Sequence, residues 1–226
     1  FWGFISGFIF VPIYIHILGI EAQGVISFMA ILSAFMSLAD SGLTSTFSRE
    51  VARSDDKKYI GNLLFTVEKI YIGICLTVFL VIFLFSSEIA RNFLKADNLF
   101  QDDLANYVIM MGVGASFQMM TSMYNGGLTG LQKQVLTNSV SVIYNIFRSV
   151  IGIIIIFLIP NLYAYFTWYI LTSIVYLFVI RYFLWKEIST HIKLVFKFDL
   201  IKNIWRFAAG MMLMTLISVT NTQIDK

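Results

Sequence analysis

The sequence has little charge and few of the residues that build catalytic or disulfide-bonded sites. Only 13% of its 226 residues are Asp, Glu, Lys or Arg, whereas soluble domains average about 25%. A single cysteine, Cys75, excludes a framework of internal disulfides, and the two histidines, His16 and His191, lie far apart in the sequence. No GxxxxGK[ST], HExxH or CxxC motif is present. We therefore expect no cofactor and no metal, and we regard an enzyme as the weaker hypothesis for the function.

The residues that are present are mostly apolar. The apolar set AVILMFWYC makes up 58% of the chain and aromatic residues 16%, with a mean hydropathy of +0.81. A soluble domain of this length could not bury so much apolar surface, because a large share of its residues must face water. The net charge of +3 is too small and too scattered for a nucleic-acid-binding protein. The composition predicts an all-α integral membrane protein.

Apolar runs define the predicted helices, since a membrane span needs about 20 mostly apolar residues. We predict six spans within residues 1–185, at 2–18, 25–46, 63–87, 104–126, 137–159 and 162–184. A seventh run begins at residue 204 and continues to residue 226. Because the chain begins with Phe1 and its last run is unfinished, we expect it to be part of a longer protein.

Basic residues predict the orientation of these spans. The connections 48–62, 130–134 and 185–203, with their flanks, hold 11 Lys and Arg residues, whereas the opposite side holds Arg91 and Lys95. Loops rich in Lys and Arg stay in the cytoplasm. We therefore expect the N-terminus to be cytoplasmic.

The connection 186–203 mixes apolar residues with Lys193, Lys197 and Lys202. This pattern predicts an amphipathic helix on the inner leaflet. Its expected role is a tether to residues 204–226, and binding of a lipid head group is the alternative.

Arg148 is the clearest charge inside a predicted span. No acidic residue lies within four positions of it, and charges at such depth usually face a cavity or a partner. Arg148 either forms a structural ion pair with Glu68 or Asp225, or contacts an anionic ligand in a water-filled cavity. Tyr144, Asn145 and Gln118 are candidates to line the same cavity.

Three carboxylates also lie in predicted spans. Glu68 is expected to face protein, and Asp225 follows a polar stretch, 220–223, that is typical of a cavity wall. Both are candidates for carrying a coupling proton or sodium ion. Asp40 precedes Ser41 and Gly42, and we favour a role in helix packing for Asp40 and Gly42 over ligand contact.

Several short patterns occur in an order that resembles one family. Near the start they are Pro12-x-Tyr14 and Leu18-Gly19-x-Glu21-x-x-Gly24, followed by Asp40-Ser41-Gly42-Leu43 and Arg49-Glu50-x-Ala52-Arg53. Further on they are Tyr124, Gly127-Leu128-x-Gly130-Leu131-Gln132 and Gln223-x-Asp225-Lys226. Together they resemble the Wzx-like flippases of O-antigen and teichoic-acid units, which are related in fold to multidrug (MATE) exporters. Ser41 stands where this family usually has Leu or Phe. Pro12 and Gly19 match the family's pattern, and we expect them to have a structural role in packing.

The resemblance implies about twelve helices in two lobes, of which this chain holds the first lobe and the opening of the second. It also implies a substrate, an oligosaccharide on undecaprenyl diphosphate, which is moved across the inner membrane. A polysaccharide polymerase and a chain-length regulator are the expected protein partners. The alternatives are a cation-coupled multidrug exporter of the same fold and a membrane enzyme of envelope polysaccharide assembly.

Overall fold

The computed structural model describes residues 2–94, 101–188 and 194–197, together with 202, 208–211, 213–214 and 217. The side chains of residues 2–9, 38–39, 41 and 101–102 are not described. Asp225, the polar stretch before it and His191 lie outside these residues, as does most of the connection 186–203. Over the described part the chain is helical and contains no strand.

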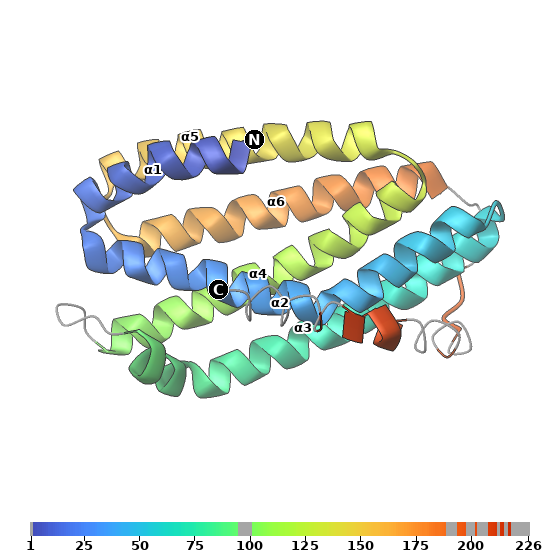
Figure 1. Cartoon of the computed structure of the whole chain (residues 1–226), viewed down its shortest axis with the longest axis horizontal. Helices are drawn as coiled ribbons and strands as arrows, with labels where there is room; N and C mark the ends of the chain where they lie inside the picture. Colours follow the sequence, from blue (N-terminus) through green and yellow to red (C-terminus); the bar gives the residue numbers. More distant parts are fainter. Residues whose placement is uncertain are drawn as a thin grey trace. The chain divides into compact units, whose positions relative to one another are not determined.

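Within the described part of the chain, six helices follow one another up to residue 188 (Figure 1). They are α1 (Trp2–Leu18), α2 (Ile20–Arg53), α3 (Lys57–Phe93), α4 (Gln101–Gly130), α5 (Gln134–Leu158) and α6 (Leu162–Ile188). The first six predicted spans each fall in one of these helices, in order, apart from residue 159 just beyond the end of α5.

Local chemistry explains where several helices begin and end. Gly19 separates α1 from α2 with a φ of 89°, in the left-handed region that a side chain disfavours. Asp56 caps α3, where its carboxylate accepts a hydrogen bond from the Lys58 amide at 2.8 Å. Asn161 caps α6 in the same way, at 2.9 Å from the Tyr163 amide.

Helical segments pack into two compact units. Unit 1 contains Phe1–Ser33, Leu76–Phe117 and Asn138–Tyr176. Its fully buried side chains include Val108, Ile156 and Phe166. A Cβ added at Gly114 would lie 2.5 Å from the Tyr169 ring and one at Gly112 would lie 2.8 Å from Ile82, so these glycines allow close helix approach.

Unit 2 contains Ala34–Cys75, Gln118–Thr137 and Leu177–Lys226. Its core includes Phe47, Leu63 and Leu64. Gly130 of α4 lies so near α2 that an added Cβ would come within 2.4 Å of the Ser48 carbonyl oxygen. The glycines near the end of α4 therefore serve helix packing.

Four of the helices are long and apolar enough to cross a membrane. They are α3, α5, α6 and the Ile20–Ser37 part of α2. Large apolar side chains such as Leu84, Ile143 and Phe178 are exposed on them, as expected of surfaces that face lipid. The chain is an all-α membrane protein, and spanning by α1 and α4 remains a prediction.

The amphipathic helix predicted for 186–203 is not continuous through its described residues, although residue 202 is helical. Residues 186–188 belong to α6, and residues 194–197 are not helical. The Val195 amide donates to Asn62 Oδ1 at 2.9 Å, and the Lys197 amide donates to Thr66 Oγ1 at 3.2 Å. Hydrogen bonds from the backbone to α3 replace those that a helix would make within itself, so the prediction is wrong over 194–197.

Candidate functional site

Arg148 lies in the middle of α5 and is the one charged residue of that helix. Its guanidinium carbon is 4.2 Å from the ring centroid of Tyr169 and 5.9 Å from that of Tyr144. Nη1 donates to the Tyr144 hydroxyl at 3.4 Å, and Tyr165 also lies near the side chain. Arg148 is therefore surrounded by tyrosines, whose rings attract a cation without neutralising it.

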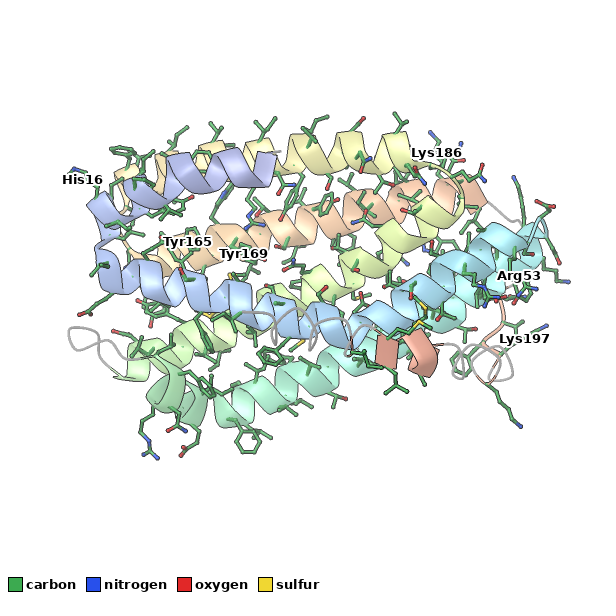
Figure 2. The ribbon with its side chains drawn as sticks, viewed as in Figure 1. His16, Arg53, Tyr165, Tyr169, Lys186 and Lys197 are labelled. Atoms are coloured by element: carbon green, nitrogen blue, oxygen red, sulfur yellow. The ribbon has the colours of Figure 1, made fainter. Side chains whose placement is uncertain are left out.

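Contacts between α5 and α6 hold this arrangement in place. The Trp168 indole donates to the Arg148 carbonyl oxygen at 3.0 Å. Tyr144 stacks on Tyr176 with centroids 4.1 Å apart, and the Tyr176 hydroxyl donates to Ser141 Oγ at 3.1 Å. Tyr165 and Tyr169, one turn apart on α6, are labelled in Figure 2. The tyrosines thus come from α5 and α6, which these contacts hold together.

Within the described residues, no acidic side chain forms an ion pair with Arg148. The ion pairs present there are Arg53–Glu50, Arg91–Glu88, Lys133–Glu187 and Arg181–Glu68. Guanidinium carries five N–H donors, and the bond to the Tyr144 hydroxyl leaves most of them unused. The arrangement can therefore accept an oxyanion.

The other predicted cavity residues are placed differently. Tyr144 contacts Arg148 directly, whereas the Asn145 amide donates to the Ser141 carbonyl oxygen of its own helix at 2.8 Å. Gln118 is exposed and belongs to unit 2, whereas Arg148 belongs to unit 1. Asp225 lies outside the described residues. The structure thus brings together Arg148 and Tyr144 from the predicted set.

Glu68 is buried in unit 2 and paired with Arg181. Arg181 donates to Glu68 Oε1 through Nε at 3.0 Å and through Nη2 at 2.9 Å. The expectation that Glu68 faces protein is confirmed. The alternative in which Glu68 is the structural partner of Arg148 is wrong, because this carboxylate is engaged by another arginine.

Asp40 is buried in unit 2 and joins three helices. Its carboxylate accepts hydrogen bonds from Thr44 of its own helix at 2.9 Å and from Tyr71 of α3. Ser122 of α4 is a further donor. Gly42, also buried, accepts a bond from Thr46 at 2.5 Å through its carbonyl oxygen. These contacts support the packing role.

Sequence reasoning missed the neighbours of these charges. Tyr165 and Tyr169 were not connected with Arg148, and Tyr71 was not connected with Asp40. A signal did exist on α6, where Tyr165, Tyr169, Ser173 and Tyr176 recur at intervals of three and four residues, which places them on one helix face. Arg181 was counted only as a charge at the membrane interface.

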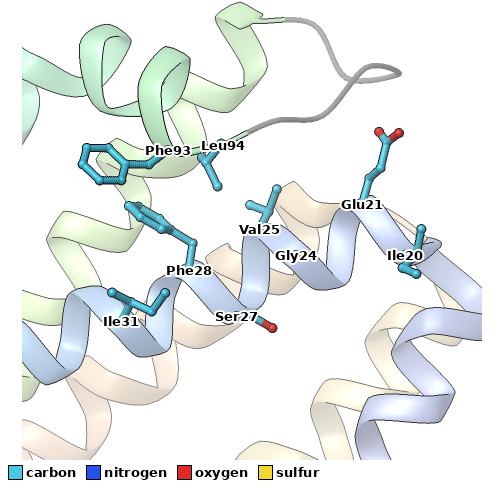
Figure 3. Close-up of a pocket in the computed structure, with 9 residues that line it drawn as sticks. All are labelled: Ile20, Glu21, Gly24, Val25, Ser27, Phe28, Ile31, Phe93 and Leu94. Atoms are coloured by element: carbon cyan, nitrogen blue, oxygen red, sulfur yellow. The ribbon is translucent and has the colours of Figure 1, made fainter. Parts of the chain in front are cut away.

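Unit 1 also contains a mostly apolar groove between the start of α2 and the end of α3 (Figure 3). Its volume is about 480 Å³. The rings of Phe28 and Phe93 face each other across it, with centroids 6.1 Å apart. Glu21 is the one charged residue in its lining, so it lacks the convergent polar groups of a specific site.

A comparison with solved structures shows the fold. The chain resembles a structure described as "Crystal structure of MATE in complex with MaL6", with a TM-score of 0.67 and 19% sequence identity. The match covers 91% of this chain and 48% of the MATE chain, so the sequence spans about half the length of that protein. The MATE-like fold predicted from the sequence is confirmed.

A comparison with curated protein sequences gives no match. The family model described as "Polysaccharide biosynthesis protein" matches residues 1–226. That model covers both units and the Arg148 site, and it agrees with the resemblance found in the sequence. The chain therefore belongs to the polysaccharide biosynthesis protein family.

Proposed function

We propose that the chain is part of a flippase that moves oligosaccharides linked to undecaprenyl diphosphate across the bacterial inner membrane. The products would serve O-antigen or another surface polysaccharide. Family membership and the MATE-like fold support a membrane transporter. In this proposal the N-terminus is cytoplasmic and the units enter from the inner leaflet.

The observation that carries the proposal is Arg148 in its tyrosine surroundings. A charged group within a membrane span costs about 3 kcal/mol or more. Cation–π contacts return about 0.5–2 kcal/mol, and no described carboxylate supplies the rest. A diphosphate would do so, because guanidinium matches phosphate oxygens in geometry and charge. The tyrosine rings would hold the arginine ready while the site is empty.

Transport of such a substrate needs shielding from hydrocarbon. The sugar and diphosphate groups cannot enter lipid without hydrogen-bond partners. In the proposed cycle the head group passes between two lobes while the prenyl chain stays in the bilayer, as in transporters that rock about a central site. Tyr144, Asn145, Gln118 and Asp225 are the further residues proposed to line the path.

The proposed cycle also requires a source of energy and partner proteins. Antiport of a proton or a sodium ion is proposed, with Glu68 or Asp225 as the carrier. The polysaccharide polymerase and the chain-length regulator are proposed partners, because they would take up the flipped units. No other cofactor is invoked.

A multidrug exporter of the same fold is the second candidate, and the MATE-like fold favours it. Its site would need net negative charge for organic cations, which Arg148 would repel. A membrane enzyme of polysaccharide assembly is the third. The experiment below separates all three.

The test uses the full-length gene. We expect its deletion to cause complete undecaprenyl-diphosphate oligosaccharides to accumulate while surface polysaccharide disappears. Absence of these intermediates would indicate an enzyme of synthesis. Normal levels of both, together with altered sensitivity to cationic dyes, would indicate the multidrug exporter.

Complementation of the deletion strain tests Arg148. Arg148→Ala should lower export at least tenfold at an unchanged protein level, since charge-assisted hydrogen bonds contribute about 1.5–3 kcal/mol. Arg91→Ala is the matched control, because Arg91 forms an exposed pair with Glu88 at 3.3 Å. Export equal to wild type by Arg148→Ala would refute the anion contact, and loss of the protein from the membrane would indicate a structural role.

A further inference from the structure

A second arginine, Arg181 of unit 2, lies in a polar cluster with unused hydrogen-bonding capacity. Both of its bonds to Glu68, at 3.0 and 2.9 Å, converge on the same oxygen, Oε1. The other carboxylate oxygen, Oε2, is buried and has no hydrogen-bond partner within the described residues. The Arg181 side chain is 43% exposed, whereas that of Glu68 is 10% exposed. The pair is therefore asymmetric, with a buried carboxylate and a guanidinium that is open on one side.

Two aromatic residues in the same unit have polar atoms that lack partners within the described residues. Tyr124 is fully buried and adjoins both Glu68 and Arg181. Its hydroxyl makes no hydrogen bond of ordinary geometry to the described residues, and neither does the buried Trp185 indole nitrogen. Trp185 lies one turn beyond Arg181 on the same face of α6. An indole N–H can only donate, and a buried donor without a partner is costly.

These spare groups are mainly donors. Arg181 and Trp185 can donate to an oxyanion, and a guanidinium pairs well with phosphate. Glu68 occupies one side of the guanidinium in the empty protein. When a phosphate takes that side, the Tyr124 hydroxyl is close enough to take over as a donor to the carboxylate, so that Glu68 is not left without a partner.

We propose that Arg181 and Trp185 form a second phosphate-binding site, which Glu68 occupies until a phosphate group displaces it and the Tyr124 hydroxyl becomes its donor. The identity of the natural ligand rests on the proposed function: it is the diphosphate of the lipid-linked oligosaccharide. Arg181 lies near the end of α6 that the basic loops assign to the cytoplasm. The proposed site would therefore receive its ligand from the cytoplasmic side. Anionic phospholipids and inorganic diphosphate carry the same chemistry.

Binding to the full-length protein tests this site directly. The purified protein is placed in zwitterionic nanodiscs and titrated calorimetrically with inorganic diphosphate. Glu68→Gln and Arg181→Gln are compared with wild type, also in an Arg148→Ala background so that the two arginines are distinguished. Arg53→Gln is the matched control, since Arg53 is exposed and pairs with Glu50 at 3.5 Å in the same unit.

The two variants should have opposite effects. Arg181→Gln should weaken binding by about tenfold, as expected for the loss of one charge-assisted contact. Glu68→Gln should tighten it severalfold, because the anion no longer displaces a competing carboxylate, and Arg53→Gln should bind as wild type does. Weaker or unchanged binding in Glu68→Gln would overturn the proposal, since a merely structural pair gives that result. If Arg181→Gln does not fold, the sign of the Glu68→Gln effect still decides.

Further arms identify the source of the phosphate. Competition by phosphatidylglycerol in the nanodisc would assign the site to a lipid head group, whereas stronger binding of undecaprenyl diphosphate would assign it to the substrate. If binding of both probes and of inorganic diphosphate is independent of Arg181, the proposed site is refuted. The gene-deletion experiment does not depend on Arg181, so failure of the proposed function and failure of this site are distinguishable.

Discussion

At the scale of single residues, Arg148 and Asp40 illustrate two ways of placing a charged group inside a helical membrane protein. Asp40 is surrounded by hydroxyl donors, which include Thr44 and Tyr71 and come from three helices. Arg148 is surrounded by aromatic rings, which leave its N–H groups largely unused. The carboxylate is therefore internally satisfied and suited to packing, whereas the guanidinium is suited to a ligand.

Removal of one hydroxyl tests the role of Asp40. Tyr71→Phe keeps the buried ring but deletes a donor to Asp40, and we expect a loss of about 1–3 kcal/mol in the free energy of unfolding. Circular dichroism at 222 nm during unfolding in detergent measures it. Tyr182→Phe is the control, because Tyr182 is 62% exposed. Equal stability of the two variants would show that the Tyr71 contact does not contribute to packing.

At the scale of helices, apolar runs predicted the order of the elements but not their ends. Span 63–87 lies inside α3, whose 37 residues extend about 55 Å at 1.5 Å per residue. Hydropathy detects only the part of a helix that is apolar, whereas the helix continues through polar ends that are capped by residues such as Asp56. Gly112 and Gly114 lie two residues apart in α4, but nothing in the sequence identifies Ile82 and Tyr169 as the residues that pack against them.

Glycine substitutions test the helix contacts. Gly130→Ala should destabilise the protein, because its Cβ would lie 2.4 Å from a backbone oxygen of Ser48 that cannot move aside cheaply. Gly73→Ala in α3 should instead raise the free energy of unfolding by up to about 1 kcal/mol. Nothing lies within 4 Å of the added Cβ, and alanine favours a helix. Thermal unfolding of the two variants in the same detergent measures both effects. A stabilising Gly130→Ala would contradict the packing of α4 against α2.

At the scale of the whole molecule, the sequence allowed the fold class to be predicted, together with Arg148 and Tyr144 of the candidate site. Arg148 could be identified because a lone charge in an apolar run is visible without a structure. Its tyrosine neighbours could not, since tyrosine is common in membrane helices and its contacts depend on how α5 packs on α6. The Glu68–Arg181 pair joins positions 113 residues apart, and no local pattern connects them.

The predicted orientation is tested by labelling with a thiol reagent that does not cross membranes. Asp55 and Asn161 are exposed in the connections that follow α2 and α5. We expect Asn161→Cys to be labelled in intact cells, and Asp55→Cys only after the inner membrane is permeabilised, because loops rich in Lys and Arg stay inside. Cys75 is buried and should contribute little background. The reverse pattern of labelling would invert the orientation.

The attachment of residues 194–197 to α3 has a consequence for how freely this connection can change its sequence. Asn62 and Thr66 accept hydrogen bonds from the amides of Val195 and Lys197, not from their side chains. Any residue with a backbone N–H preserves these bonds, and proline, which has none, does not. Residues 194–197 can therefore vary widely in composition among related proteins while Asn62 and Thr66 hold their backbone against α3.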